Sequence, residues 1–212
     1  DDFGRSGKAN QPWKSITWAM NNVPFKEEEA NIVVREGTYT PSILYFGIQR
    51  GGKVSESLPF NLLAYPGEEV VLDGRNVASK SALISISGAE NITISGITLS
   101  NVEGSGKSVV YITNSNGITL SDNKITNAKW TVDPGEAEAP TLADRLNVIA
   151  VVGQSTNIII KNNMLNDLVT GYGEPILIAD TVQAELSKNT TKNVDASTFV
   201  GQRYFVSKQG SD

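Results

Sequence analysis

The sequence predicts an all-β fold, a three-sided parallel solenoid of about six coils with one short capping helix. Three similar runs support this prediction: Asn91–Asn101, Gly117–Asn127 and Asn157–Asp167. A fainter copy covers Leu186–Asn193. Each run contains only short β-type segments and turn residues, so a single repeat cannot enclose a core. The repeats must therefore stack, each covering the apolar side of the next.

The spacing of the repeats locates an insertion. Leu99 and Ile125 are equivalent at a step of 26 residues, whereas Ile125 and Leu165 are 40 apart. The longer step is one repeat plus about 14 residues, which fall within 128–147. Three short strands and three corners per repeat indicate a triangular cross-section, with about 4.8 Å between corresponding strands.

The first predicted element is a helix over Pro12–Asn21. Trp13, Ile16 and Met20 recur at helical spacing, and proline suits a first helical turn. A strand over 31–35 and a second run from Thr38 follow, and residues 41–58 are expected to form a long loop or a distorted coil. Further strands are expected over 60–64, 70–72 and 83–86, separated by turns at Pro66-Gly67 and Asp73-Gly74.

One asparagine recurs at the same corner of successive repeats, as Asn123, Asn163 and Asn189. Stacked inward asparagines can pass amide hydrogen bonds along a column and satisfy the backbone at a sharp bend. The alternative is that asparagine is present because it tolerates left-handed turn geometry.

The repeats resemble the coils of right-handed parallel β-helix proteins of the pectate-lyase-like superfamily over roughly residues 60 to 195. The segments Gln11–Met20 and Asn31–Tyr39 are also similar to that family, in which the helix caps the open first coil. The resemblance implies one β-helix domain over 1–212. Its parts are the capping helix and opening loop (1–30), the coils (31–195) and a displaced opening strand (196–212).

The last segment, Tyr204–Asp212, resembles the strand with which relatives begin. Joining Asp212 to Asp1 would restore the usual order. A circular permutation, one window of a tandem array, or a strand donated to a neighbouring molecule would each explain this order. The alternative is a coincidental strand.

Composition excludes several function classes. Without histidine or cysteine, the chain holds no Ser-His-Asp triad, no zinc site built on either residue and no disulfide. A net charge of −5 disfavours nucleic acid as a partner. No stretch is apolar and long enough to span a membrane. The absence of cysteine fits a bacterial protein that is extracellular or on the cell surface.

The insertion is the predicted saccharide-binding region. In lyases that the repeats resemble, loops at this edge border a saccharide groove. Trp130 offers a flat face for a sugar ring, Lys129 or Arg145 could act as a base, and Asp133 with Asp144 could hold Ca²⁺. Tyr111 is the remaining predicted contact.

The alternative is that Trp130 fixes an acidic loop to the side of the solenoid. Other acidic residues of the insertion are Glu136 and Glu138.

The strand that follows the insertion, with its equivalents in other repeats, is expected to present a mostly apolar outer face. Strand alternation divides its residues into two sets. The inward set is Ile84, Ile86, Val110, Ile112, Ala150, Val152 and Ile178. The outward set is Leu83, Ser85, Val109, Tyr111, Ile149, Val151, Leu177 and Ala179. Such a stripe favours coverage by a loop, a partner domain or a second copy.

Two functions follow from these observations. One is a polysaccharide-associated β-helix, lyase-like or carbohydrate-binding; as an enzyme it would be a polysaccharide lyase or glycoside hydrolase. The other is a structural or assembly module that associates through its apolar stripe or terminal strand. No catalytic motif matches residue by residue.

Overall fold

Three parallel sheets form the walls of the molecule. The computed structural model describes residues 2–23, 30–47, 59–78, 80–104, 108–131, 146–171 and 173–195. Sheet A contains β1 (Ala30–Val34), β4 (Phe60–Ala64), β7 (Glu90–Ser95), β10 (Asn116–Ser121), β13 (Thr156–Lys161) and β16 (Ala184–Ser187). Sheet B contains β2 (Gly37–Tyr39), β5 (Val70–Asp73), β8 (Thr98–Gly104), β11 (Lys124–Trp130), β14 (Met164–Val169) and β17 (Thr190–Asp195). Sheet C contains β3 (Leu44–Gly47), β6 (Ile84–Ser87), β9 (Ser108–Thr113), β12 (Asn147–Val152) and β15 (Ile176–Ile178).

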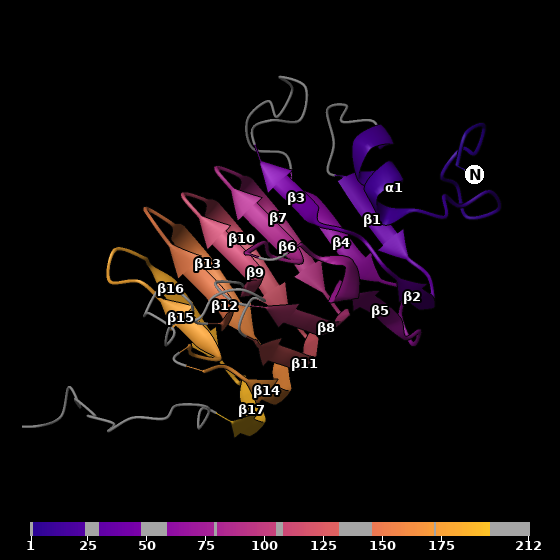
Figure 1. Cartoon of the computed structure of the whole chain (residues 1–212). Helices are drawn as coiled ribbons and strands as arrows, with labels where there is room; N and C mark the ends of the chain where they lie inside the picture. Colours follow the sequence, from indigo (N-terminus) through magenta and orange to yellow (C-terminus); the bar gives the residue numbers. More distant parts are fainter. Residues whose placement is uncertain are drawn as a thin grey trace, which may run out of the picture.

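The chain visits the sheets in the repeating order A, B, C, so each coil adds one strand to each wall (Figure 1). Every strand pair is parallel, and six coils contribute to sheets A and B. The predicted three-sided solenoid of about six coils is thus confirmed. A short 3-10 helix, η1 (Gly74–Asn76), follows β5.

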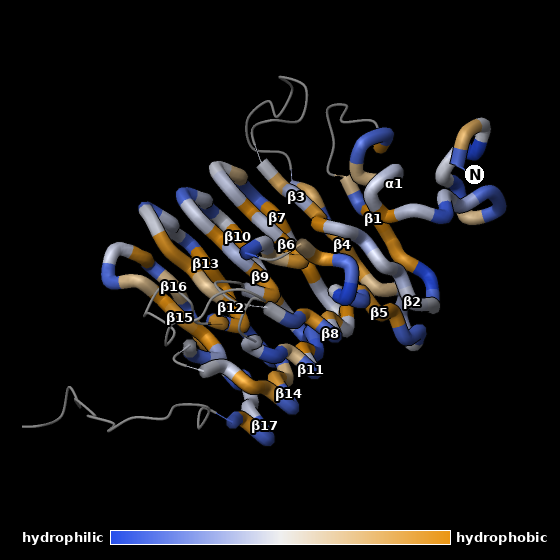
Figure 2. The backbone as a smooth tube through the Cα atoms, viewed as in Figure 1, coloured by the Kyte–Doolittle hydropathy of each residue, from blue (hydrophilic) through white to orange (hydrophobic). Residues whose placement is uncertain are grey.

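The interior is filled by columns of apolar side chains. On sheet A, for example, Leu62, Ile94, Leu120 and Ile160 lie in register in successive coils, and all are buried. Hydrophobic residues lie along the strands and hydrophilic ones gather at the turns (Figure 2). Burying an aliphatic side chain contributes about 1.5–3 kcal/mol, so each coil is stabilised mainly by its neighbours.

The predicted asparagine column is a hydrogen-bonded ladder. Asn123 Nδ2 donates to Asn163 Oδ1 (3.1 Å), and Asn163 Nδ2 donates to Asn189 Oδ1 (3.0 Å). The same oxygens accept backbone N–H groups from the preceding rung, since the Asn123 and Asn163 amides donate to them at 3.0 Å. The ladder therefore satisfies the backbone at the corner between sheets A and B.

Left-handed backbone is found beside the ladder rather than in it. Asp122 and Asn162, which precede two ladder residues, have φ of 58° and 55°. A second column with φ between 53° and 58° bends the strands of sheet B and consists of Asn101, Asn127, Asp167 and Asn193. Asparagine and aspartate adopt this conformation more readily than other residues with a side chain. Hydrogen bonding thus explains the ladder asparagines, whereas tolerance of left-handed backbone explains the residues beside them.

The capping helix is shorter than predicted. Helix α1 spans Ile16–Asn22 and begins after Ser15, whose side chain accepts the Trp18 N–H (3.1 Å). The prediction of a start at Pro12 is wrong, because this N-cap hydrogen bond fixes the first turn four residues later. Ile16 and Met20 are buried, as predicted, and α1 lies against the first coil (Figure 1). Trp13 precedes the helix, and its Nε1 donates to Arg5 O (3.0 Å).

Residues 41–58 are not a loop throughout. They contain β3, whose Leu44 and Phe46 are buried while Tyr45 between them is exposed. The prediction of a long loop or a distorted coil did not locate this strand, because only the three residues from Leu44 to Phe46 alternate between buried and exposed before Gly47. Residues 48–58 lie outside the described part of the chain, as does the predicted terminal strand within 196–212.

Candidate functional site

The outer face of sheet C carries a row of in-register residues, the tyrosine row, with exposed tyrosines on β3, the last described strand of the sheet, and on the central strand β9. Tyr45, Ser85 and Tyr111 are in register on β3, β6 and β9. Tyr45 is 37% exposed and Tyr111 36%, whereas Ser85 between them is half-buried and small. The two tyrosines are two rungs apart, or roughly 9.6 Å along the solenoid. A small serine side chain thus separates the two rings along the row.

Tyr45 lies flat against its own strand. A methyl group placed on Gly47 would lie 2.7 Å from Tyr45 Oη and 2.8 Å from Tyr45 Cε1. The Tyr45 ring therefore covers Gly47, and it can do so because glycine has no side chain at this position. The Cε1 and Oη side of the ring thus lies over Gly47, and the residue as a whole stays 37% exposed.

Sheet C is electrically neutral. Its five strands contain no aspartate, glutamate, lysine or arginine. The next outward positions after the tyrosine row include Ser87 and Thr113, which are in register and half-buried. The described strands thus combine two aromatic rings with hydroxyl groups, and they contribute no carboxylate, lysine or arginine to this face.

The predicted apolar stripe on this face is not exposed. Leu83, Val109, Ile149 and Val151, all predicted outward, are fully buried. On β12 the assignment was wrong by one residue: Ile149 and Val151 are in register with the inward Val110 and Ile112, while Ala150 pairs with Tyr111. Every residue from 148 to 152 is apolar, so alternation could not distinguish the two sides. Tyr111 and Leu177 are outward as predicted, and Leu177 is half-buried.

The structure does not bring the predicted saccharide contacts together. Trp130 is 7% exposed and belongs to the hydrophobic core, which favours the alternative of a structural tryptophan. Lys129 is exposed on the outer face of sheet B, opposite Glu103. Tyr111 lies on sheet C, and Arg145 lies outside the described residues, as do Glu136 and Glu138. Of the four predicted contacts, Tyr111 alone is in the tyrosine row.

No calcium site is evident in the described ranges. There, no group of three potential ligands among histidine, cysteine, aspartate and glutamate comes together. Asp133 and Asp144, the predicted Ca²⁺ ligands, lie outside these ranges.

Asp73 is the only buried charged side chain in the described part of the chain. Its carboxylate accepts hydrogen bonds from Arg75 Nε and Asn101 Nδ2, both at 3.0 Å. The side-chain hydrogen bond from Arg75 lowers the pKa of Asp73 from 3.8 to about 2, with help from the Arg75 amide and Asn101 and against the effect of burial. A carboxyl group that stays ionised at neutral pH cannot serve as a general acid. Its role is to join the turn after β5 to β8.

The pKa of Asp73 predicts a loss of stability in acid. Because the folded pKa is depressed, the contribution of this group is complete above about pH 4 and is lost as the pH falls towards 2. The shift corresponds to roughly 2 kcal/mol. We expect the free energy of unfolding, measured with urea at a series of pH values, to show this decline in the natural chain. Asp73→Asn should flatten it between pH 4 and 2, and an unchanged decline would contradict the assignment.

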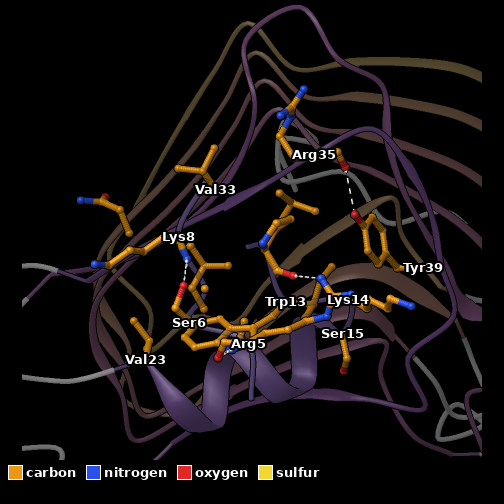
Figure 3. A pocket seen from close by; sticks show the side chains of 17 residues that line it. Arg5, Ser6, Lys8, Trp13, Lys14, Ser15, Val23, Val33, Arg35 and Tyr39 are labelled. Atoms are coloured by element: carbon orange, nitrogen blue, oxygen red, sulfur yellow. Dashed lines mark hydrogen bonds between the residues drawn. The ribbon is translucent and has the colours of Figure 1, made fainter. Parts of the chain in front are cut away.

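A second feature is a cavity of about 580 Å³ between the cap and β1 (Figure 3). The indole of Trp13 forms one side, and Val33 of β1 and Arg35, which follows this strand, lie on the other. Arg35 is paired with Glu68, to which its Nε donates at 2.7 and 2.8 Å. The other basic residues that line the cavity are Arg5, Lys8 and Lys14.

Residues 61–206 match the family described as "Right handed beta helix region". The match covers more than half of the chain. The chain belongs to the right-handed β-helix family. This match agrees with the three parallel sheets and establishes the handedness that the resemblance implied.

The chain is also similar to "Uncharacterized protein YwoF" of Bacillus subtilis (strain 168), with 27% identity over 139 residues. The similarity covers 62% of this chain but 28% of that protein, so the chain spans less than a third of its relative's length. No solved structure matches the chain. Within the described residues, none of the helices has the length and hydrophobicity that a membrane span requires.

Proposed function

We propose that this β-helix binds neutral polysaccharide, outside the cell or on its surface, through the outer face of sheet C. The observation that carries the proposal is the tyrosine row: two exposed rings separated by a serine, on a flat sheet without charged residues. Tyrosine suits sugar binding because its ring packs on the apolar face of a pyranose while its hydroxyl group forms hydrogen bonds.

The lack of charged residues on the strands of sheet C favours a binding module over a lyase. Elimination from a uronate requires a base and a cation or Ca²⁺ beside the sugar carboxylate. The strands of sheet C supply neither, and a glycosidase would require two carboxylates. Binding without cleavage is therefore the activity that this face supports best.

Replacing the exposed tyrosines tests the proposal. Neutral glycans such as soluble xylan, mannan and cellulose oligosaccharides would be titrated calorimetrically, with polygalacturonate as the charged comparison. We expect binding to at least one neutral glycan, with Kd raised about tenfold or more by Tyr111→Ala and again by Tyr45→Ala.

A matched control is Tyr65→Ala. Tyr65 is exposed on the turn after β4, where its ring lies 4.6 Å from the Arg35 guanidinium. Its removal should leave the affinity unchanged. Binding that tolerates loss of both row tyrosines, or unsaturated product released from polygalacturonate, would contradict a neutral binding face on sheet C.

A further inference from the structure

Strand β1 is an edge strand whose outer side borders the cap cavity. It is the terminal strand of sheet A, and among the described strands it pairs with β4 alone. The Ala30 N–H donates to Pro59 O (2.9 Å), and Val34 O accepts the Tyr65 N–H (2.8 Å). Residues that bond one neighbour alternate along a parallel strand with residues that face the other side. The backbone N–H and C=O of Val33 therefore point away from β4, towards the edge.

The cavity has the size and lining that an extended peptide requires. Its volume of about 580 Å³ lies within the range of about 300–1,000 Å³ that drug-sized ligands fill. Apolar residues line it from both sides: Trp13, Ile16 and Ala19 from the cap, and Ile32, Val33 and Val34 from β1. A strand placed there would gain backbone hydrogen bonds along one side and apolar contacts with the cap on the other.

The chain itself contains a fitting segment. Tyr204-Phe205-Val206-Ser207 is a run of residues with high strand propensity, and it lies outside the described strands.

This segment can hardly reach β1 of its own chain. The last described strand, β17, ends at Asp195 at the opposite end of the solenoid from β1 (Figure 1). Six rung spacings separate that end from a position beyond β1, or roughly 29 Å. The nine residues from Asp195 to Tyr204 extend at most about 32 Å. Almost no length remains for crossing from sheet B to sheet A.

We propose that the cavity beside β1 accepts the Tyr204–Ser207 strand of a second copy of this chain. The donated strand extends sheet A by one rung at the capped end. Since β1 and β17, the strand that the donated segment follows in sequence, lie at opposite ends of the solenoid, the proposed contact is head-to-tail and joins successive copies into open chains. This inference is independent of the proposed saccharide binding.

Single cysteines test the proposal cleanly because the natural chain has none. Val33→Cys, whose site is 48% exposed, would be mixed with four separate donors: Tyr204→Cys, Phe205→Cys, Val206→Cys and Ser207→Cys. Adjacent strands place Cα atoms within the distance of about 4.4–6.8 Å that a disulfide requires. We expect disulfide-linked dimers from at least one mixture under mild oxidation.

The matched acceptor control is Lys161→Cys. Lys161 is exposed on the same sheet, but its strand, β13, is paired on both sides and should not form dimers with these donors. Absence of dimers from every Val33→Cys mixture would overturn the proposal. A chain carrying both Val33→Cys and Val206→Cys that closes only on itself would also overturn it.

A second measurement does not depend on cysteines. Sedimentation velocity of the natural chain should show association that grows with concentration. Val206→Pro should abolish it, because proline removes a backbone donor from the strand, whereas Ser211→Pro beyond the strand should not. A natural chain that stays monomeric at high concentration, or association unchanged by Val206→Pro, would contradict strand donation.

Discussion

Asn163→Ala is expected to lower the free energy of unfolding by about 4 kcal/mol. The Asn163 side chain is buried and occupies the centre of the ladder. Its amide donates to Leu120 O and Asn189 Oδ1, both at 3.0 Å, and its oxygen accepts from the Asn123 backbone and side chain. Alanine would leave the Leu120 carbonyl and the Asn123 amide buried without these partners. Each such group costs about 1–3 kcal/mol.

Urea unfolding followed by circular dichroism measures this loss. Asn166→Ala is the matched control, since Asn166 is a half-buried asparagine on the adjacent strand β14 and its side chain makes no hydrogen bond with the described residues. The control should change stability by less than about 0.5 kcal/mol. If both variants were equally stable, the ladder would not contribute to the stability of the corner.

The ladder could be predicted because asparagine recurs at one register while the residues around it vary. A polar residue repeated on an inward position has to be satisfied by its own copies. The apolar columns of sheet A are marked in a similar way, since inward Ile and Leu alternate with Thr, Ser and Asn.

The inward and outward residues of sheet C could not all be predicted, for a local reason. On β12 five apolar residues follow one another, so neither side of the strand is marked in the sequence. The length of the insertion before it adds no constraint on register. The inward pair Ile149 and Val151 is determined instead by pairing with Val110 and Ile112 of β9, a contact between residues about 40 apart.

The tyrosine row was half predicted. Tyr111 was placed outward because its neighbours on β9 alternate. Tyr45 could not be placed from the sequence, because residues 41–58 show little periodicity and predict only a long loop or a distorted coil. That Tyr45 lies two rungs from Tyr111 can be recognised only when the register of the coils is known. The structure supplies that register.

Trp130→Ala is expected to cost about 3–5 kcal/mol of stability and to leave glycan affinity unchanged. Trp130 is buried at the end of β11, opposite Gly104 on β8. Replacing a buried tryptophan by alanine removes a large apolar surface and leaves a cavity, with a penalty of this size. A ring buried in the core cannot stack on a sugar, so the folded fraction of the variant should bind as the natural chain does.

Tyr111→Ala should give the opposite pattern, with weaker glycan binding and little change in stability. The free energy of unfolding should change by less than about 1 kcal/mol, because Tyr111 is more than a third exposed. Both variants would be compared by thermal unfolding and by calorimetric titration with a glycan that the natural chain binds. Trp130→Phe should recover most of the stability lost in Trp130→Ala. A Trp130→Ala protein that keeps its unfolding temperature but loses affinity would place the sugar at the insertion and exclude the tyrosine row as the binding surface.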